Sequence, residues 1–261
     1  MKPDPLVSLA AALLLSAGGW AAGALTASGA LAATAVGAAI LLGAGWPGAA
    51  VLGAFFILGS SIGRILDPGH PVGDAKGERR DAWQVLANGG CAAVGAGLAA
   101  GRPGLALWIV TGSLAAAGAD TWATATGGMS RTLPRLLLIG RVVPAGTNGG
   151  MTLLGTAGAA LGAWLISGTG GGASGSLRLV LWGTAIGTGG MVLDSILGAT
   201  LQGRFRCPSC GVDSEHRTHR CGTRTEHTGG AFWLTNDGVN AVTTAAGALA
   251  GLVAWRCASS I

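Results

Sequence analysis

The residues best suited to chemistry lie in one glycine-rich segment, Arg141-Val-Val-Pro-Ala-Gly-Thr-Asn-Gly-Gly-Met-Thr152. Glycines leave backbone N–H groups free to turn toward a ligand. A helix expected from about Met151 would direct the positive end of its dipole at the same place. These are the parts of a phosphate-binding loop, with an arginine as a charge clamp. The alternative is a plain connection between two apolar helices. The residues assigned to the loop are Arg141, Gly146, Thr147, Asn148, Gly149 and Gly150.

Two aspartates are the strongest candidates for catalysis because they lie at the end of, or within, long apolar stretches. Asp120 ends one stretch, and Asp194, followed by Ser195, lies inside another. An ionisable residue at membrane depth is costly and is usually functional. Carboxylates that face a phosphate-binding loop suit Mg²⁺, which prefers oxygen ligands. We therefore predict Asp120 and Asp194 as magnesium ligands, with Asp237 as a third. The alternative for Asp120 is an ion pair with a loop arginine.

Amide side chains begin two other predicted helices and complete the predicted site. Gln84 and Asn88 share a helix face, and so do Asn236 and Asn240, because each pair is spaced by four residues. We predict that these amides orient phosphate oxygens or water. Simpler interpretations stay open. Gln84 and Asn88 can join neighbouring helices, and Asn236 or Asp237 can cap its own helix.

A hydrophilic segment nearer the C-terminus carries a separate signal, Cys207-Pro-Ser-Cys210-Gly, followed by a histidine and a third cysteine. Three sulfurs and one imidazole match a closed structural zinc site. A disulfide is not expected in a reducing cytoplasm. The predicted Zn²⁺ ligands are Cys207, Cys210, His219 and Cys221, with His216 as the chief competitor of His219 and His227 as a weaker one.

The composition places most of the chain in lipid. Of the 261 residues, 50% are hydrophobic and 10% are charged, and the mean hydropathy is +0.55. A soluble domain carries about 25% charged residues. The net charge of +5 comes from arginines in loops, without the basic stripe and interleaved aromatic residues that indicate nucleic-acid binding. We therefore expect an integral membrane protein that binds no nucleic acid.

Apolar runs of about 20 residues, the length that crosses a bilayer, predict an all-α polytopic bundle of seven to eight transmembrane helices. The first 62 residues hold either two or three of these helices. We predict one integral membrane domain, residues 1–261, with a small Cys/His loop at 203–230, and we expect 168–175 to be an external loop. The expected helices are Leu6–Ala22, Leu25–Gly45, Ala49–Leu66, Trp83–Ala100, Gly104–Ala123, Met151–Ser167, Leu177–Leu201 and Ala231–Trp255.

The distribution of charge predicts how the bundle is oriented. Loops 64–82, 124–149 and 202–230 fall on one side of the membrane and hold 12 of the 16 lysines and arginines. The positive-inside rule makes these loops cytoplasmic, in a protein of the plasma membrane. The candidate polar residues lie toward the same side. This one-sided clustering argues against a transporter, in which polar residues lie near the midplane.

Five motifs occur in an order that resembles the DUF92 family of integral membrane proteins, which includes the TMEM19-like proteins and the plant phytyl-phosphate kinases. The resemblance extends from about Leu25 to the last helix. The motifs are Gln84-Val-Leu-Ala-Asn88-Gly, Ala119-Asp-Thr-Trp-Ala123, Val143-Pro-Ala-Gly-Thr-Asn-Gly-Gly150, Asp194-Ser-Ile-Leu-Gly-Ala-Thr-Leu-Gln202 and Asn236-Asp-Gly-Val-Asn240.

The resemblance to the plant branch implies a kinase that moves a phosphoryl group from a nucleoside triphosphate to an isoprenyl monophosphate. Related possibilities are a CTP-dependent lipid-alcohol kinase and a cytidylyltransferase that makes a CDP-lipid. A lipid transporter or binding protein without chemistry is the alternative from another class. In the family the aspartate motif usually continues with a serine and a glutamate, where this chain has Thr124 and Ala125. The lipid's chain length, CTP or ATP as donor, and the oligomeric state stay open.

Overall fold

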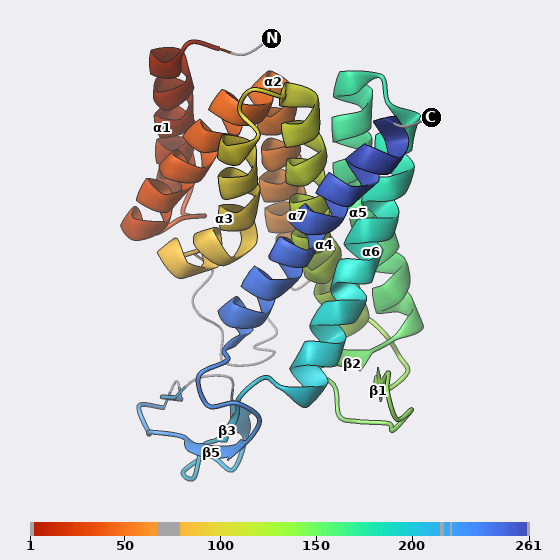
Figure 1. Ribbon diagram of the computed structural model, residues 1–261. Helices are drawn as coiled ribbons and strands as arrows, with labels where there is room; N and C mark the ends of the chain where they lie inside the picture. The colour runs from red at the N-terminus through yellow and green to blue at the C-terminus, as the bar shows by residue number, and fades with distance from the viewer. Residues whose placement is uncertain (1–2, 67–78, 215–216, 220, 260–261) are drawn as a thin grey trace.

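The computed structural model describes residues 3–66, 79–214, 217–219 and 221–259. Most of these residues are helical, and the helices form a bundle with small strands beneath one end (Figure 1). The helices are α1 (Pro5–Ala21), α2 (Ala27–Leu66), α3 (Ala82–Leu98), α4 (Pro103–Gly128), α5 (Leu153–Ser174), α6 (Leu177–Thr200) and α7 (Asn236–Ser259). The strands are β1 (Arg135–Leu136), β2 (Gly150–Met151), β3 (Arg204–Arg206), β4 (Asp213–Ser214) and β5 (Glu226–Gly229).

Helix α2 consists of two helical arms that fold back on each other. Gly45 has φ 68° and ψ −159°, which breaks the helix, and Pro47 follows closely. The arms lie side by side, because a Cβ on Gly37 would be only 3.9 Å from Leu52 Cδ2. In a straight helix these positions would be more than 20 Å apart at about 1.5 Å per residue. The two arms therefore correspond to two of the eight predicted helices.

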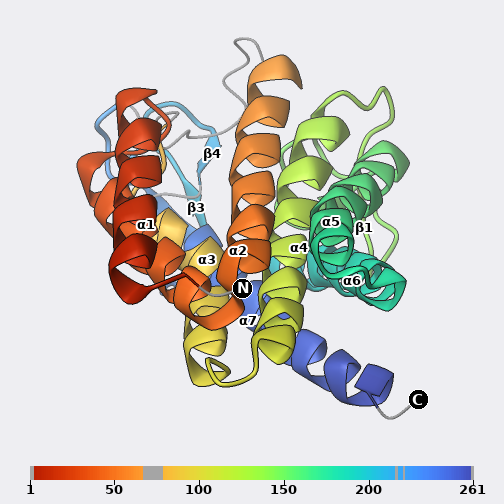
Figure 2. The same ribbon diagram turned by 90° about the horizontal axis from the view of Figure 1, so that it is seen from above.

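Helix α4 occupies the centre of the bundle. Every residue from Leu105 to Ala119 is buried, and α4 packs against α2, α3, α5, α6 and α7. Figure 2 shows α4 between α2 on one side and α5 and α6 on the other. A helix buried on all sides belongs to the interior of a bundle. Other helices, rather than lipid, therefore surround α4.

The helical membrane bundle that the composition predicts is present. Within the described residues, four helical runs are long and apolar enough to cross a membrane by length and composition: Ala27–Gly63, Leu153–Ser174, Leu177–Thr200 and Asn236–Ser259. Helices α1 and α3 are shorter, with 17 residues each. A total of seven to eight crossings stays a prediction.

The outer surface is that of a protein surrounded by lipid. Large apolar side chains are exposed on most of the helices. Exposed tryptophans lie near both ends of the bundle, where aromatic side chains of membrane proteins meet the two interfaces. Trp20, Trp83 and Trp233 lie near one end, and Trp46 and Trp182 near the other, whereas the exposed Trp164 lies near the middle of α5.

The long connections gather at one end of the bundle, here called the loop end, which comprises 22–26, 79–81, 129–152 and 201–235 (Figure 1). The connections at the far end, 99–102 and 175–176, are short. The first two loop-end segments are joined directly: the Arg80 N–H donates to the Ala24 carbonyl at 2.9 Å. This grouping agrees with the sequence. The side of the membrane that the loop end faces stays a prediction.

Short strands form at the loop end of this mostly helical chain. β1 and β2 pair antiparallel, and β3 lies between β4 and β5 in a second antiparallel sheet. As Met151 belongs to β2, α5 begins at Leu153 rather than at Met151. Thr152 caps α5, since its hydroxyl accepts the Gly155 N–H at 3.0 Å.

The run 168–175 is not the external loop that its glycines suggest. Helix α5 continues to Ser174 and ends at Gly175, whose φ is 68°. A Cβ on Gly170 would lie 2.7 Å from Thr111 Oγ1, so this glycine serves close packing. In an apolar setting a helix persists through glycine because unpaired backbone groups would find no water.

Candidate functional site

Helices α4 and α6 touch through small residues in a regular register. A Cβ on Gly183 would lie 3.2 Å from Thr111 Cγ2, and a Cβ on Gly187 would lie 2.8 Å from the Ala115 carbonyl oxygen. From the first contact to the second, the residue number rises by four in both helices, so α4 and α6 run in the same direction. Backbones approach this closely in membranes only where one partner is small.

The register shifts by two residues at the next contact, which brings the two candidate aspartates to a similar level. The next contact joins Gly190, whose Cβ would lie 2.6 Å from the Ala116 Cβ. Asp194 and Asp120 follow these residues by four positions, so each lies on the contact face of its helix, one turn closer to the loop end. Both aspartates are partly buried. Helices α4 and α6 therefore present one carboxylate each to the same region.

A small apolar cluster beside these aspartates joins their helices to the glycine-rich segment. Ala119, Ala159, Ala163 and Met191 are its buried members, and Met151 of β2 packs against them. The cluster thus connects α4, α5 and α6 with the strand that follows the predicted phosphate-binding loop. It forms an apolar floor at the level of the carboxylates.

Helix α7 adds polar groups to this level from another side. A Cβ on Gly247 would lie 3.1 Å from the Ala116 Cβ, and α7 begins at the loop end. Thr243, four residues earlier in α7, therefore lies at the level of Asp120. Its side chain is buried, and its hydroxyl donates to the Asn240 carbonyl at 3.0 Å. Asn240 itself is partly buried.

Helix α3 packs on α7 near these residues, but its two amides have local structural roles. The Thr244 hydroxyl donates to the Ala87 carbonyl at 2.8 Å, which fixes α3 against α7. The Asn88 amide donates to the Gln84 carbonyl within its own helix at 2.8 Å. Gln84 and Asp81 form a capping box at the start of α3, with two hydrogen bonds of 3.0 Å. Gln84 therefore caps its helix, an interpretation that the spacing alone did not suggest.

The glycine-rich loop packs directly on the helical turn that follows Asp194. Gly146 and Gly149 have φ of 83° and 75°, values that disfavour any side chain. A Cβ on Gly149 would collide with the Ser195 carbonyl and would lie 2.6 Å from the Ala199 Cβ. The absence of a side chain at Gly149 thus permits the loop to contact α6 beside the aspartate.

Hydrogen bonds within the loop leave some N–H groups available to a ligand. The Thr147 hydroxyl donates to the Pro144 carbonyl at 2.8 Å, and the Gly150 N–H donates to the Thr147 carbonyl at 2.9 Å. In the described part of the chain, the N–H groups of Gly146 and Asn148 donate to no protein acceptor. The Gly149 N–H likewise donates to no acceptor among the described residues, so these three N–H groups are open to a ligand.

Arg141 and Ser195 are not directed at the aspartates. Arg141 is exposed, and its side chain makes no ion pair with the described residues; its carbonyl accepts the Leu136 N–H at 2.9 Å. The Ser195 hydroxyl points back along its own helix toward Met191 Sδ, at 3.8 Å. The charge clamp on a ligand phosphate stays a prediction for Arg141.

At the start of α7, the residue that caps the helix is not one of the predicted binding residues. Thr235 caps the helix, since its hydroxyl accepts the Gly238 N–H at 3.4 Å, so the capping interpretation offered for Asn236 or Asp237 is wrong. Asn236 is exposed, and Asp237 is partly buried. Asp237 lies in the first turn, where the helix dipole favours a negative charge.

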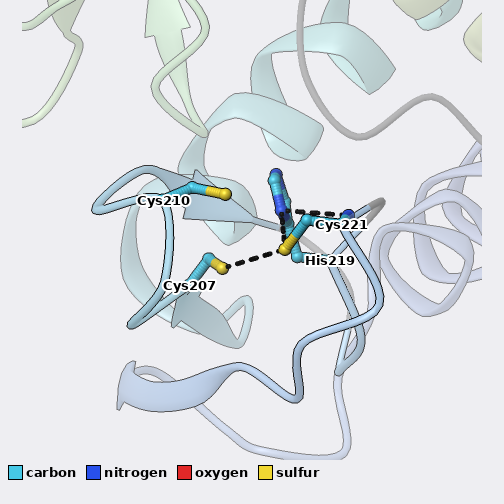
Figure 3. Close-up of side chains that lie close together, drawn as sticks. All are labelled: Cys207, Cys210, His219 and Cys221. Atoms are coloured by element: carbon cyan, nitrogen blue, oxygen red, sulfur yellow. Dashed lines mark hydrogen bonds between the residues drawn. The ribbon is translucent and has the colours of Figure 1, made fainter.

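The four predicted zinc ligands lie together beneath the bundle (Figure 3). The ligand atoms of Cys207, Cys210, His219 and Cys221 all lie within 4.8 Å of one another. The Cys207 and Cys221 sulfurs are 3.6 Å apart, and His219 Nδ1 is 3.0 Å from the Cys221 sulfur. Sulfur ligands around one tetrahedral zinc are about 3.7 Å apart, for Zn–S bonds of about 2.3 Å. The residues therefore fit a structural metal ion.

Two similar turns present these ligands. The Gly211 N–H donates to the Cys207 carbonyl at 2.8 Å, and the Gly222 N–H donates to the His219 carbonyl at 2.8 Å. Both glycines have positive φ, 68° and 83°. Each turn brings a ligand at its start close to a second ligand near its end, so the backbone shapes the site without help from a large core.

The thiols of the cluster differ in their tendency to ionise. Hydrogen bonds from Thr223 and then His219 lower the pKa of Cys221 to about 5. Hydrogen bonding with Cys221 raises the pKa of Cys210 to about 11. A metal binds thiolates, so its binding releases the proton of Cys210 at neutral pH.

The histidine alternatives are resolved in part. The His227 ring packs against Phe205 and Phe232, with centroid distances of 5.5 and 5.8 Å, so it is not a ligand. His216 lies outside the described residues.

The Cys/His unit, residues 203–230, is attached to the last turn of α6. The Gly203 N–H donates to the Leu234 carbonyl at 2.9 Å, which joins the two ends of the unit. Gln202 is buried, and its Oε1 lies 3.4 Å from the position of a Cβ on Gly198. The Gly149 nitrogen lies 3.1 Å from the same position. The Cys/His unit and the glycine-rich loop therefore meet on one turn of α6.

Comparison with known proteins identifies the family. The sequence matches the family described as integral membrane protein DUF92 over residues 10–248. The chain belongs to the DUF92 family. It is 36% identical over 149 residues to an uncharacterized membrane protein of Methanocaldococcus jannaschii, a match that covers 57% of this chain and 63% of that protein. No solved structure matches the chain. Family membership confirms the resemblance carried by the five motifs.

In this DUF92 protein, Ala125 stands where the resemblance implies a glutamate, and it lies on a different face of α4 from Asp120. Five residues separate the two positions, which places them about 140° apart around a helix of 3.6 residues per turn. Ala125 instead shares a face with Thr121. A glutamate here would not extend from the same face as the Asp120 carboxylate.

Two carboxylates at one level fit Mg²⁺, which commonly uses one or two carboxylates together with water and substrate phosphates. Asp120 and Asp194 are the candidates for this role. In the described part of the DUF92 chain, the Cys/His cluster is the one group of three or more metal-binding side chains. A role for Asp237 as a third magnesium ligand stays a prediction.

Arg80 is a residue of the loop end that sequence reasoning used only as a positive charge. Its guanidinium lies over the Phe55 and Phe56 rings, 5.4 and 5.6 Å from their centroids. A Cβ on Gly59 would lie 3.2 Å from Arg80 Nη2 and 3.6 Å from Thr121 Cγ2. Arg80 thus reaches the turn of α4 that carries Asp120. In the sequence, only its position just before the start of α3 could have indicated that Arg80 has a fixed place at the loop end.

A cavity of about 390 Å³ opens at the far end of this DUF92 protein, away from the candidate site. Trp108 and Trp255 line it, and their rings meet edge to face with centroids 6.0 Å apart. Arg178 also lines it and donates to the Ala258 carbonyl at 2.7 Å. With no carboxylate in its lining, the cavity lacks the ligands that phosphoryl transfer requires.

Proposed function

We propose that this DUF92 protein is a membrane-embedded isoprenyl-phosphate kinase. It transfers the γ-phosphoryl group of a nucleoside triphosphate, CTP or ATP, to a prenyl or phytyl monophosphate and forms the diphosphate. The observation that carries the proposal is the pairing of Asp120 with Asp194 in register, with the glycine-rich loop packed on the turn after Asp194. Carboxylates beside open backbone N–H groups suit a nucleotide with its metal.

The reaction needs positioning more than acid–base chemistry. An oxygen of the lipid monophosphate attacks the γ-phosphorus, the bond to the bridging oxygen breaks, and the nucleoside diphosphate leaves with that oxygen. The acceptor is already ionised, so no strong general base is required. Catalysis of this kind rests on alignment and on stabilisation of charge. Ala125 in place of the family's glutamate is therefore compatible with activity.

The described residues have separate parts in this scheme. The N–H groups of Gly146 and Asn148 bind oxygens of the donor phosphates. Asp120 and Asp194 would hold Mg²⁺, which neutralises charge on the transferred group when bound. Asn240 orients phosphate oxygens or water at the same level. The Cys/His unit would hold a structural Zn²⁺ and keep the last turn of α6 in place.

The location follows from the reaction. We propose that the loop end faces the cytoplasm, where nucleotides are available, and that the bundle lies in the plasma membrane. The excess of arginine in the loops supports this orientation. The isoprenoid tail would lie among membrane lipids at the apolar surface of the helices.

The test is an assay of the purified full chain in detergent with Mg²⁺, labelled CTP or ATP, and phytyl, geranylgeranyl and undecaprenyl monophosphates. The proposal expects γ-label in a lipid diphosphate, and its loss in Asp120→Asn. Label from the α-phosphate in the lipid would identify a cytidylyltransferase instead. Transfer to a lipid alcohol alone would identify a lipid-alcohol kinase. An absence of any transfer by folded, metal-loaded protein would overturn the enzyme proposal.

A further inference from the structure

Arg80 is held in place by its backbone. Its N–H donates to the Ala24 carbonyl at 2.9 Å, and its carbonyl accepts the Thr26 N–H at 3.0 Å. Leu25 and Arg80 pair as a short parallel bridge between the α1–α2 turn and the start of α3. The origin of the side chain is therefore fixed relative to three helices.

The side chain reaches from this anchor into the loop end of the bundle. The two phenylalanine rings of α2 lie beneath the guanidinium, and the lack of a side chain at Gly59 leaves room for Nη2. Thr121 lies on the other side of that space. The positive charge therefore lies near Thr121, the residue that follows Asp120 in α4, on the side of α4 that faces α2.

The neighbouring arginine shows what a structural arginine does in this segment. Arg79 donates from Nε to the Leu25 carbonyl and from Nη2 to the Trp20 carbonyl, both at 3.1 Å, at the end of α1. Among the residues that the structure describes, the Arg80 guanidinium makes no hydrogen bond or ion pair. Its five N–H donors are partly buried, and such donors are costly unless an acceptor meets them.

Burial lowers the pKa of Arg80, yet arginine keeps its proton at any physiological pH. A permanent cation with a planar set of donors favours phosphate, which it can bind through two parallel hydrogen bonds. The surroundings indicate which phosphate. Trp20 and Trp83, at the adjoining helix ends, are 51% and 73% exposed, as expected at the depth of lipid headgroups.

We infer that Arg80 binds the phosphate monoester of the lipid acceptor. The inference rests on the proposed function and assigns its two substrates to adjoining parts of the loop end. The glycine-rich loop packs on α6 and takes the nucleotide, and Arg80 packs on α2 and takes the lipid phosphate. Asp120 lies between them. The lipid's apolar chain then extends from the headgroup level along the outside of the bundle.

The test measures binding without nucleotide, using the full chain in detergent and geranylgeranyl monophosphate as the probe. Geranylgeraniol and inorganic phosphate are the comparison ligands. Arg80→Gln is expected to weaken monophosphate binding about 10-fold or more, the effect of losing charge-assisted hydrogen bonds, and to leave binding of the alcohol unchanged. Arg80→Lys should retain part of the affinity. Arg79→Gln is the matched control and should bind as the wild type does.

A second variant covers the case in which Arg80→Gln fails to fold. Gly59→Ala places a methyl group 3.2 Å from Nη2 and displaces the guanidinium, so it should weaken monophosphate binding several-fold and spare the alcohol. Unchanged monophosphate binding in a folded Arg80 variant would overturn the inference, and so would equal loss of both lipids. If inorganic phosphate binds as tightly as the lipid monophosphate, and if that binding also depends on Arg80, the site recognises phosphate in general and not the lipid.

The outcome is separable from that of the kinase proposal. Arg80-dependent binding of the monophosphate, with no phosphoryl transfer under any condition, leaves this site in place and refutes the kinase. Full transfer by Arg80→Gln at an unchanged KM for the lipid leaves the kinase in place and refutes this role of Arg80.

Discussion

The two parts of α4 differ in their burial. From Leu105 to Ala119 every residue is buried, whereas none of residues 120–128 is fully buried. The first part is surrounded by helices that touch it through glycine and alanine. The second part carries Asp120 and meets the loops. One helix therefore serves as the centre of packing along most of its length and as a wall of the candidate site at its end.

This difference shows where a ligand-binding site can form in a bundle whose helices pack through small residues. In the buried part, glycines of α6 and α7 lie so close to α4 that an added Cβ would collide with its atoms. Such interfaces leave no room for a ligand. At the loop end, where the helices give way to strands and turns, polar side chains from α4, α6 and α7 lie at a similar level.

The largest effect should come from removing the metal from the Cys/His unit. Structural zinc binding contributes an apparent free energy of about 10–16 kcal/mol, and residues 203–230 have few other stabilising contacts. Cys210→Ser or a strong chelator should abolish metal binding and make this unit sensitive to trypsin, while the helices keep their thermal stability. Metal analysis and limited proteolysis measure these effects.

Cys257→Ser is the control for that experiment, since Cys257 is exposed near the end of α7, away from the cluster. It should retain one metal ion per chain. Unchanged proteolysis of metal-free Cys210→Ser would show that the unit folds without the ion.

The second effect concerns chemistry at the open part of α4. Asp120→Asn keeps the shape of the side chain and removes its charge, so turnover should fall about 100-fold or more, equivalent to about 2.7 kcal/mol. Ser113→Ala, in the buried part of the same helix, should retain full turnover. The proposed assay with labelled nucleotide compares the two variants. Equal activity of Asp120→Asn and wild type would remove the functional distinction between the two parts of α4.

Much of this division could be predicted from the sequence, because apolar runs and charge patterns have few alternative explanations. The break in α2 followed from Gly45 and Pro47, and the cluster of four metal ligands followed from their spacing. Local hydrogen bonding was not predictable in the same way. Gln84 has a residue type and spacing that suit a site, yet its partner Asp81 makes it a cap.

Other features were missed because their causes lie far apart in the chain. The register that pairs Asp120 with Asp194 depends on contacts such as Gly190 with Ala116, which no local pattern reveals. The same holds for Arg80, whose role depends on phenylalanines about 25 residues earlier. The glycines in 168–174 suggested a loop, because a soluble helix would break there.

The third effect tests the contact between the glycine-rich loop and α6. Gly149→Ala forces a side chain into a left-handed backbone at a cost of about 1–2 kcal/mol, and the new Cβ would collide with the Ser195 carbonyl. The KM for the nucleotide should rise about 10-fold while the KM for the lipid changes little. Gly140→Ala is the control: its φ is also positive, 62°, but no atom lies within 4 Å of the added Cβ. A similar KM in both variants would show that the loop's contact with α6 is unimportant.

The smallest effect compares a buried hydroxyl of α4 with a buried hydroxyl of α7 that has a hydrogen-bond partner. Thr111 Oγ1 is fully buried and has no hydrogen-bond partner, whereas the Thr244 hydroxyl donates to the Ala87 carbonyl at 2.8 Å. Valine has nearly the shape of threonine without the hydroxyl. Thr111→Val should therefore raise stability by up to about 1 kcal/mol, and Thr244→Val should lower it by about the same amount. Thermal unfolding of the two variants in one detergent measures the difference. A loss of stability in Thr111→Val equal to that in Thr244→Val would mean that the centre of the bundle holds a polar partner for Thr111, and the buried part of α4 would then be less purely a packing surface than its neighbours indicate.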